Sequence, residues 1–119
     1  MTDLSGKVAI ITGASGFLAS GIVPVFRKAG ASLVLPGAED RLYDRFPELK
    51  DADNHLISAT TDLTDPDVVE QLINNAIEKF GRIDILVNIV GGWDAGKPVH
   101  ETSIDTWETM MLLNAKTTF

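Results

Sequence analysis

Apolar positions along the chain fall into two alternating patterns. Three short, nearly continuous runs rich in Ile, Val and Leu, at residues 7–12, 32–35 and 83–88, are typical of buried strands. Residues 54–59 form a fourth run with a weaker apolar pattern. After each run the apolar side chains recur at helical spacing, in residues 17–29, 39–49 and 66–80 and again from residue 104 onward. The pattern therefore predicts four strands, each followed by a helix.

Two of the predicted helices carry proline or capping signals. Thr64 and Asp65 are both possible N-caps of the third helix, Pro66 suits its first turn, and Gly81 is a natural stop. Pro24 lies within the first helical pattern, where it either delays the start of the helix or kinks it by removing one backbone donor. Ser103 is the expected N-cap of the last helix, and the second helix is expected to stop before Pro47.

Strict alternation of strands and helices favours an α/β fold with a parallel sheet and helices on both faces, that is, three αβα layers. Right-handed crossovers between the strands favour the spatial order 3-2-1-4, as in a Rossmann-like, doubly wound dinucleotide-binding domain. With 119 residues, the chain is expected to form one domain, residues 1–119, since domains average ~150 residues.

Composition narrows the range of partners. Ten Lys and Arg against 17 Asp and Glu give a net charge of −7, which argues against non-specific binding to nucleic acid or to anionic membranes. The chain has no cysteine, so disulfides and thiolate chemistry are excluded. No metal site is expected, because the two histidines lack further ligands at short spacing. With no apparent signal peptide or long apolar segment, we expect a cytoplasmic protein.

The sharpest chemical signal is the sequence TGASG at residues 12–16, between the first strand and the first helix. Gly13 allows a tight turn, Gly16 allows backbone to approach a ligand, and the helix start favours an anion such as a pyrophosphate. This loop alone does not distinguish a nicotinamide cofactor from a flavin, a nucleotide sugar or S-adenosylmethionine.

Several segments together resemble the N-terminal part of the short-chain dehydrogenase/reductase family. Residues 4–13 (LSGKVAIITG) resemble its first strand, and residues 62–64 (DLT) resemble the segment after its third strand. Residues 81–88 (GRIDILVN) are similar to its fourth strand, and residues 88–91 (NIVG) stand where the family has Asn-Asn-Ala-Gly. Residues 107–119 resemble its fifth helix. The resemblance covers essentially the whole chain.

The resemblance implies an oxidoreductase that transfers hydride between NAD or NADP and a small-molecule carbonyl or alcohol substrate. It implies a homo-oligomer, a dimer or tetramer, and a cofactor site built from Gly13, Ser15, Gly16, Phe17, Leu18, Asp62, Leu63, Asn88, Val90 and Gly91. The Asp62 carboxylate would accept from the adenine amino group. Asn114 corresponds to the active-site Asn that holds a water in a helix irregularity. The alternative is a non-catalytic dinucleotide-binding or regulatory protein of the same fold.

Catalysis in this family also needs a Tyr-x-x-x-Lys pair, in which the ammonium lowers the tyrosine pKa. Tyr43 is the only tyrosine, and Pro47 stands four residues later. The domain is therefore expected to be incomplete at its C-terminus and inactive as these 119 residues alone.

The sequence departs from the family pattern at the cofactor. Phe17 and Ala19 occupy two usual glycine positions, and Val90 replaces a small alanine, so the groove is expected to be narrowed. The end of the second strand carries Pro, Gly and Ala at residues 36–38 in place of the Asp or Arg that sets coenzyme choice. Glu39 and Arg41 lie just beyond and favour opposite coenzymes, which leaves the preference open.

Overall fold

The computed structural model describes residues 2–59 and 62–119. Its centre is a parallel sheet of four strands in the order β3-β2-β1-β4, as predicted. The strands are β1 (Val8–Ile11), β2 (Ser32–Pro36), β3 (His55–Ser58) and β4 (Ile85–Val87). Each begins or ends within two residues of its apolar run, so the continuous hydrophobic pattern located all four strands.

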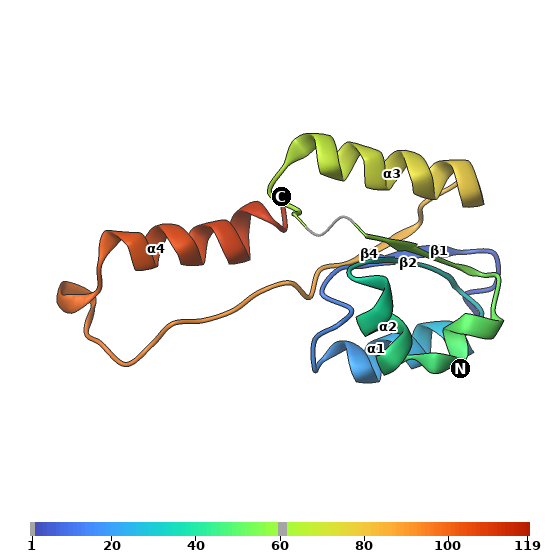
Figure 1. Cartoon of the computed structure of the whole chain (residues 1–119), viewed down its shortest axis with the longest axis horizontal. Coiled ribbons are helices and arrows are strands. Elements are labelled where there is room, and N and C mark those ends of the chain that lie inside the picture. Colours follow the sequence, from blue (N-terminus) through green and yellow to red (C-terminus); the bar gives the residue numbers. More distant parts are fainter. Residues whose placement is uncertain (1, 60–61) are drawn as a thin grey trace.

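The helices cover both faces of the sheet (Figure 1). On one face lie α1 (Ala19–Lys28), α2 (Glu39–Arg45) and the 3₁₀ turn η1 (Pro47–Asp51), and on the other lies α3 (Pro66–Phe80). Side chains of β1 alternate between two cores: Ile11 packs with the α1 side, and Ile10 packs with Leu72 of α3. Burial on both faces explains why the strand is apolar throughout.

Local signals set the helix ends. Asp65, rather than Thr64, is the N-cap of α3, and its side chain accepts a hydrogen bond from the Asp67 backbone N–H. Gly81 ends that helix in the left-handed conformation with φ +76°. Pro24 lies inside α1, which begins at Ala19, so the alternative of a late helix start is wrong.

The second helix stops before Pro47, as expected. α2 ends at Arg45, and residues 47–51 form a separate 3₁₀ turn. Pro47 explains the break, because proline disfavours helical backbone in the residue before it. Leu42 and Leu49 are both buried in the same core, so the apolar spacing continues across the break in the backbone.

The chain after β4 extends away from the sheet (Figure 1). After β4 an extended segment leads to the 3₁₀ turn η2 (Val99–Glu101), then α4 (Ile104–Met111) and a π-helical turn, η3 (Leu112–Lys116). Ser103 is the N-cap of α4, as expected, and accepts from the Thr106 N–H at 3.2 Å. No residue of α4 is buried, so its apolar side chains are largely uncovered in this chain.

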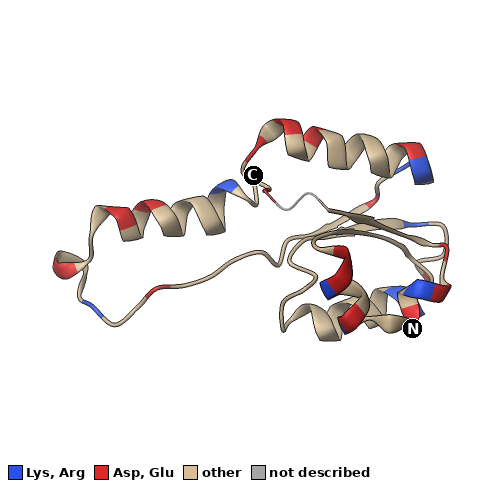
Figure 2. Ribbon diagram, viewed as in Figure 1, with Lys and Arg blue, Asp and Glu red and all other residues tan. Residues whose placement is uncertain are grey.

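Charge is spread over the helices. Figure 2 shows acidic residues on α2, α3 and α4 rather than on one of these helices alone. None of the helices in the described part of the chain is long and apolar enough to cross a membrane.

Candidate functional site

A groove of about 410 Å³ opens where β1 and β2 end. Its lining comes from the loop after β1, the end of β2, the first turn of α2 and the segments that follow β3 and β4, and consists of Gly13, Ser15, Pro36, Gly37, Ala38, Arg41, Leu63 and Val90. Ligands of open α/β sheets bind at the carboxyl ends of the strands. The groove therefore lies where the fold places a ligand, and its volume is within the ~300–1,000 Å³ usual for ligand sites.

The floor of the groove depends on Gly13. This residue has φ +67°, and a Cβ added to it would lie 2.9 Å from the Val90 backbone nitrogen. The chain after β4 thus passes directly against the turn after β1. Only glycine permits both the left-handed backbone and that close approach.

Thr12, just before that turn, ties β1 to the segment after β4. Its N–H donates to the Val87 carbonyl at 3.0 Å, and its Oγ1 accepts from the Ile89 N–H at 3.2 Å. These bonds continue the pairing beyond the strands and hold the two walls of the groove together. Sequence reasoning used Thr12 only as part of a motif and did not identify this role.

The turn that enters α1 presents free backbone donors. Gly16 N–H donates to the Gly13 carbonyl at 2.9 Å, whereas the N–H groups of Phe17 and Leu18 have no acceptor within residues 2–59 and 62–119. The first turn of α1 has no acidic residue, and its last turn holds Arg27 and Lys28. Free donors at a helix start without competing carboxylates favour a bound anion.

The two residues expected to narrow the groove behave differently. Val90 lines it, so the expectation of a tighter wall there stays a prediction. The Phe17 side chain is 91% exposed and is not among the groove-lining residues. The Phe17 ring therefore does not fill the groove.

Asp62 and Leu63 are neighbours in the chain but lie in different surroundings. Leu63 lines the groove. Oδ1 of Asp62 accepts from Thr64 N–H at 3.0 Å and from Thr64 Oγ1 at 2.6 Å. These bonds, with a smaller contribution from the Lys116 ammonium, lower the pKa of the Asp62 carboxyl. The carboxylate is held ionised and exposed beside the segment that lines the groove.

Asn88 is not brought into the groove. It lines a separate, largely apolar hollow of about 100 Å³ between the sheet and α3, which Leu72 and Phe119 also line. Gly91 lies near the other predicted site residue: a Cβ added to Gly91 would lie 2.8 Å from Asn114 Oδ1.

Asn114 lies in the π-helical turn η3 and bonds to the loop after β4. Its Oδ1 accepts from Gly92 N–H at 3.0 Å, and its Nδ2 donates to the Gly92 carbonyl and to the Met110 carbonyl, both at 2.9 Å. The irregular helix that the family resemblance implied is therefore present at this residue. In this chain the amide fixes the loop relative to the helix.

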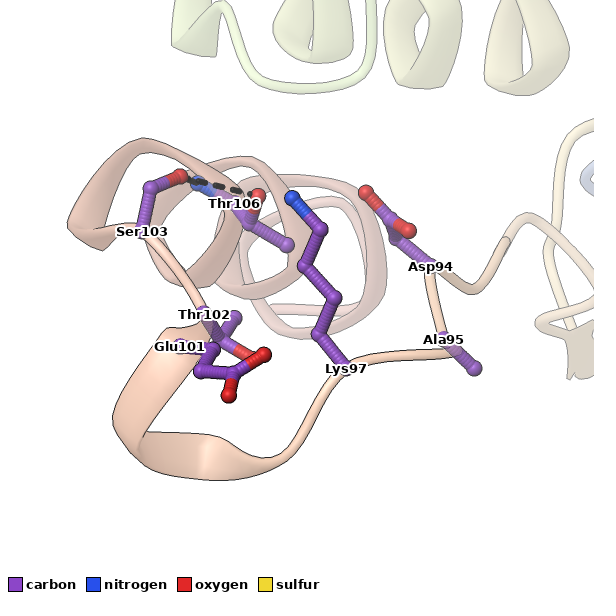
Figure 3. Close-up of a pocket in the computed structure, with 7 residues that line it drawn as sticks. All are labelled: Asp94, Ala95, Lys97, Glu101, Thr102, Ser103 and Thr106. Carbon is purple, nitrogen blue, oxygen red and sulfur yellow. Dashed lines mark hydrogen bonds between the residues drawn. The ribbon is translucent and has the colours of Figure 1, made fainter.

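A second hollow, of about 170 Å³, lies between the β4–α4 loop and the start of α4. Figure 3 shows Lys97 extending across it toward Thr106, with Asp94 on one side and Glu101 on the other. It shares no lining residue with the groove. Trp93, which precedes Asp94, is largely exposed. No group of three or more metal-ligating side chains was found within the described residues.

These features define a class: an α/β dinucleotide-binding fold whose ligand groove lies beside a glycine turn at the carboxyl edge of the sheet. Comparison with known proteins is more specific. The sequence profile of the short chain dehydrogenase family matches residues 7–119, and the chain belongs to that family.

The similar proteins share the fold of this chain and are longer than it. A short chain dehydrogenase/reductase of Colletotrichum higginsianum, dpchG, is 32% identical over 114 residues, which are 95% of this chain and 42% of that protein. A crystal structure of a short-chain dehydrogenase/reductase (glucose/ribitol dehydrogenase) from Brucella melitensis superimposes with a TM-score of 0.86 at 28% identity, covering 100% of this chain and 51% of the other. A 3-ketoacyl-(acyl-carrier-protein) reductase of the same organism, crystallised with NADH, gives 0.82 at 28% identity, covering 98% and 47%. The chain thus spans about half the length of the relatives it matches.

Proposed function

We propose that this chain is the coenzyme-binding part of an NAD(P)-dependent oxidoreductase, and that residues 1–119 belong to one such domain. The complete protein would transfer hydride between the nicotinamide ring and a small carbonyl or alcohol substrate. The observation that carries the proposal is the groove at the ends of β1 and β2, bounded by Gly13 and Val90. The loop that lines it at Gly13 and Ser15 continues into the free N–H groups of Phe17 and Leu18.

The residues present suit a dinucleotide. The N–H groups of Phe17 and Leu18 would hold the pyrophosphate, because they are unsatisfied donors at the positive end of α1. Leu63 and Val90 supply apolar walls for the adenosine. Asp62, ionised and only partly occupied by Thr64, would accept from the adenine amino group.

The coenzyme, when bound, supplies the hydride chemistry, and the residues of this chain bind and orient the coenzyme. Asn114 acts as a positioning residue here: its two-way bond to Gly92 fixes the loop that follows β4. The contribution of Asn88 to the site stays a prediction, because the Asn88 side chain lines the hollow beneath α3 rather than the groove.

The proposal extends to assembly and location. A homo-oligomer is supported by exposed apolar residues at the end of the chain: Trp107 and Met111 of α4 and Leu112 at the start of η3 are each about half exposed. A cytoplasmic location agrees with a protein that draws on the NAD(P) pool and has no cysteine to oxidise.

The test is a calorimetric titration of the full-length protein with NADH and with NADPH, carried into the millimolar range, which corresponds to about −4 kcal/mol of binding free energy. We expect heat of binding with at least one coenzyme and a matching rise in melting temperature. Absence of both with either coenzyme would refute the proposal. Binding without turnover on a panel of carbonyl and alcohol substrates would favour the non-catalytic alternative.

A further inference from the structure

Trp93 places a large, exposed aromatic side chain near the groove. Its side chain is 83% exposed, in the extended segment that follows β4. This segment leaves the carboxyl end of β4, and ligands of open α/β sheets bind at the carboxyl ends of the strands. Trp93 comes three residues after Val90, which lines the groove, so its Cα lies at most about 11 Å from that wall. The indole is therefore within reach of a molecule bound next to the coenzyme.

The backbone that carries Trp93 is fixed. The preceding residue, Gly92, donates to Asn114 Oδ1 at 3.0 Å and accepts from its Nδ2 at 2.9 Å. A Cβ on Gly92 would lie 2.7 Å from Leu113 Cδ2, and a Cβ on Gly91 would lie 2.8 Å from Asn114 Oδ1. The two glycines thus allow close packing against η3. Little backbone freedom would be lost when a ligand packs on the indole.

The segment between the groove and the indole carries no charge. Residues 85–93 (ILVNIVGGW) contain no Asp, Glu, Lys, Arg or His. The first charged residue is Asp94, which lines the separate hollow that Lys97 crosses (Figure 3). A molecule lying along this segment would meet apolar side chains and backbone, and no side chain that pairs with a charge. The segment therefore suits the uncharged, apolar part of a substrate.

We infer that the indole of Trp93 is a wall of the substrate site, and that the substrate bears its carbonyl or alcohol group on a planar aromatic ring. Aromatic rings pack on an indole in offset-stacked or edge-to-face arrangements, which adds to the gain from apolar contact alone. This inference rests on the proposed oxidoreductase function and adds the class of substrate. Trp93 is a specificity-determining residue in it, with no part in the hydride step.

Tryptophan fluorescence of the full-length protein tests this contact directly. The protein is first saturated with NAD⁺ or NADP⁺, whichever binds in the calorimetric titration, so that no hydride is available and a ketone stays unreacted. Acetophenone is then compared with cyclohexyl methyl ketone, which has the same carbon skeleton without the planar ring. Acetophenone should quench the fluorescence saturably, with a Kd about 3- to 10-fold lower than that of the saturated ketone. In Trp93→Leu, which keeps an apolar side chain, the saturable quenching should disappear.

Steady-state reduction of the two ketones gives a second measurement. Trp93→Leu should raise the KM for acetophenone about 3- to 10-fold, change kcat less than about 2-fold and leave the KM for cyclohexyl methyl ketone unchanged. Trp93→Phe should restore the KM for acetophenone, and both variants should keep the Kd for the coenzyme. Val99→Ala is the matched control: it removes an exposed apolar side chain from η2, further along the same segment, and should leave every constant unchanged.

Saturable quenching that persists in Trp93→Leu, or equal Kd values for the two ketones, would overturn the inference. It would also be overturned if neither ketone quenched the coenzyme-bound protein saturably, whether or not the ketones are reduced. Each of these results leaves the proposed function intact, because coenzyme binding is measured separately. No binding of either coenzyme to the unsubstituted protein would overturn the proposed function itself.

Discussion

Asn114 and Gly92 form a two-way hydrogen bond: Oδ1 of Asn114 accepts from Gly92 N–H at 3.0 Å, and Nδ2 donates to the Gly92 carbonyl at 2.9 Å. Asn114 lies in the π-helical turn and Gly92 in the loop after β4, 22 positions earlier. A side-chain amide carries an acceptor oxygen and a donor nitrogen, so it can satisfy a backbone donor and a backbone acceptor of the same residue together. The pair thus connects the extended end of the chain to the segment that lines the groove.

Replacing Asn114 with alanine should free this loop. Gly92 N–H would lose its acceptor, and the Gly92 carbonyl its donor, so amide exchange at Gly92 should rise about 10-fold or more, as for loss of roughly 1.5 kcal/mol of local protection. Hydrogen exchange followed by NMR measures this directly. Asn74→Ala in α3 changes helix propensity equally at an exposed site and should leave Gly92 unaffected. An unchanged rate at Gly92 in Asn114→Ala would show that the bond does not hold the loop.

Gly13→Ala should destabilise the protein more than Gly6→Ala. Both glycines have positive φ, +67° and +75°, so each variant carries the ~1–2 kcal/mol cost of a left-handed alanine. Only at Gly13 does the new Cβ meet backbone, 2.9 Å from Val90 N, whereas at Gly6 nothing lies within 4 Å. We expect a further loss of about 1–3 kcal/mol at Gly13 from overpacking. Urea denaturation of the two variants compares the free energies of unfolding, and equal losses would contradict the close approach.

The stability of the fold should fall as the pH drops below about 6.5. His55, only 8% exposed, starts β3, and its Nε2 lies 3.1 Å from the Tyr43 hydroxyl. Burial lowers the pKa of this imidazole below its ordinary value of 6.5, and the Lys79 ammonium and, more weakly, Arg27 add to the effect. The Ala52 backbone and Asp53 oppose this lowering of the pKa without reversing it. Since the unfolded chain then binds the proton more readily, this contribution is present above pH 6.5 and is lost as the pH falls through the folded-state pKa.

Urea denaturation between pH 5 and 8 tests the titration of His55. His55→Gln should flatten the pH dependence in this window, because the group that titrates differently in the two states is gone. His100→Gln is the control, since His100 is the other histidine and lies exposed in η2. If His100→Gln removed the dependence and His55→Gln did not, the assignment to the buried imidazole would be wrong.

Much of the fold could be predicted because its signals are local. The apolar stripe of α3, its Asp65 cap and its Gly81 end lie within one helix, and the strand order follows from the handedness of the crossovers. The π turn at residues 112–116 could not be seen in this way. One extra residue in a helical turn hardly changes the apolar spacing, and the bonds that stabilise it come from Gly92, far away in the chain.

The site was predicted less completely for a similar reason. Gly13, Ser15, Leu63 and Val90 come together because motif spacing fixes the loops at the strand ends. The positions of Asn88 beneath α3 and of Arg41 in the groove depend on how the helices pack on the sheet. No pattern in the neighbouring residues encodes that packing, so Arg41 and Glu39 appeared equivalent in the sequence.

These 119 residues alone should catalyse no hydride transfer. Tyr43, the only tyrosine, contacts His55 at the start of β3, so it lies at the amino end of the sheet. The groove opens at the carboxyl ends of the strands. No tyrosine can therefore exchange a proton at a substrate bound beside the coenzyme. Absorbance of the reduced nicotinamide, followed with a panel of carbonyl substrates, should stay at background, and turnover would refute this assignment.

The same 119 residues should also self-associate through β4. Within the described residues β4 pairs only with β1 and forms one edge of the sheet. Strands of parallel sheets are normally covered on both faces, and an apolar edge invites pairing with another chain. Leu86 in the middle of β4 is 57% exposed. Ile85 lines an apolar hollow of about 540 Å³ between this edge and α1, together with Val25 and Phe26.

Light scattering over a range of concentrations should therefore give a mass above that of one chain, 12.8 kDa. Leu86→Lys should shift the distribution toward the monomer, because a charged side chain on an edge strand opposes pairing. Val99→Lys is the matched control: it places the same charge on an exposed apolar residue in η2, away from the sheet, and should leave association unchanged. A monomer at every concentration, or equal dissociation by the two variants, would show that the β4 edge does not drive assembly.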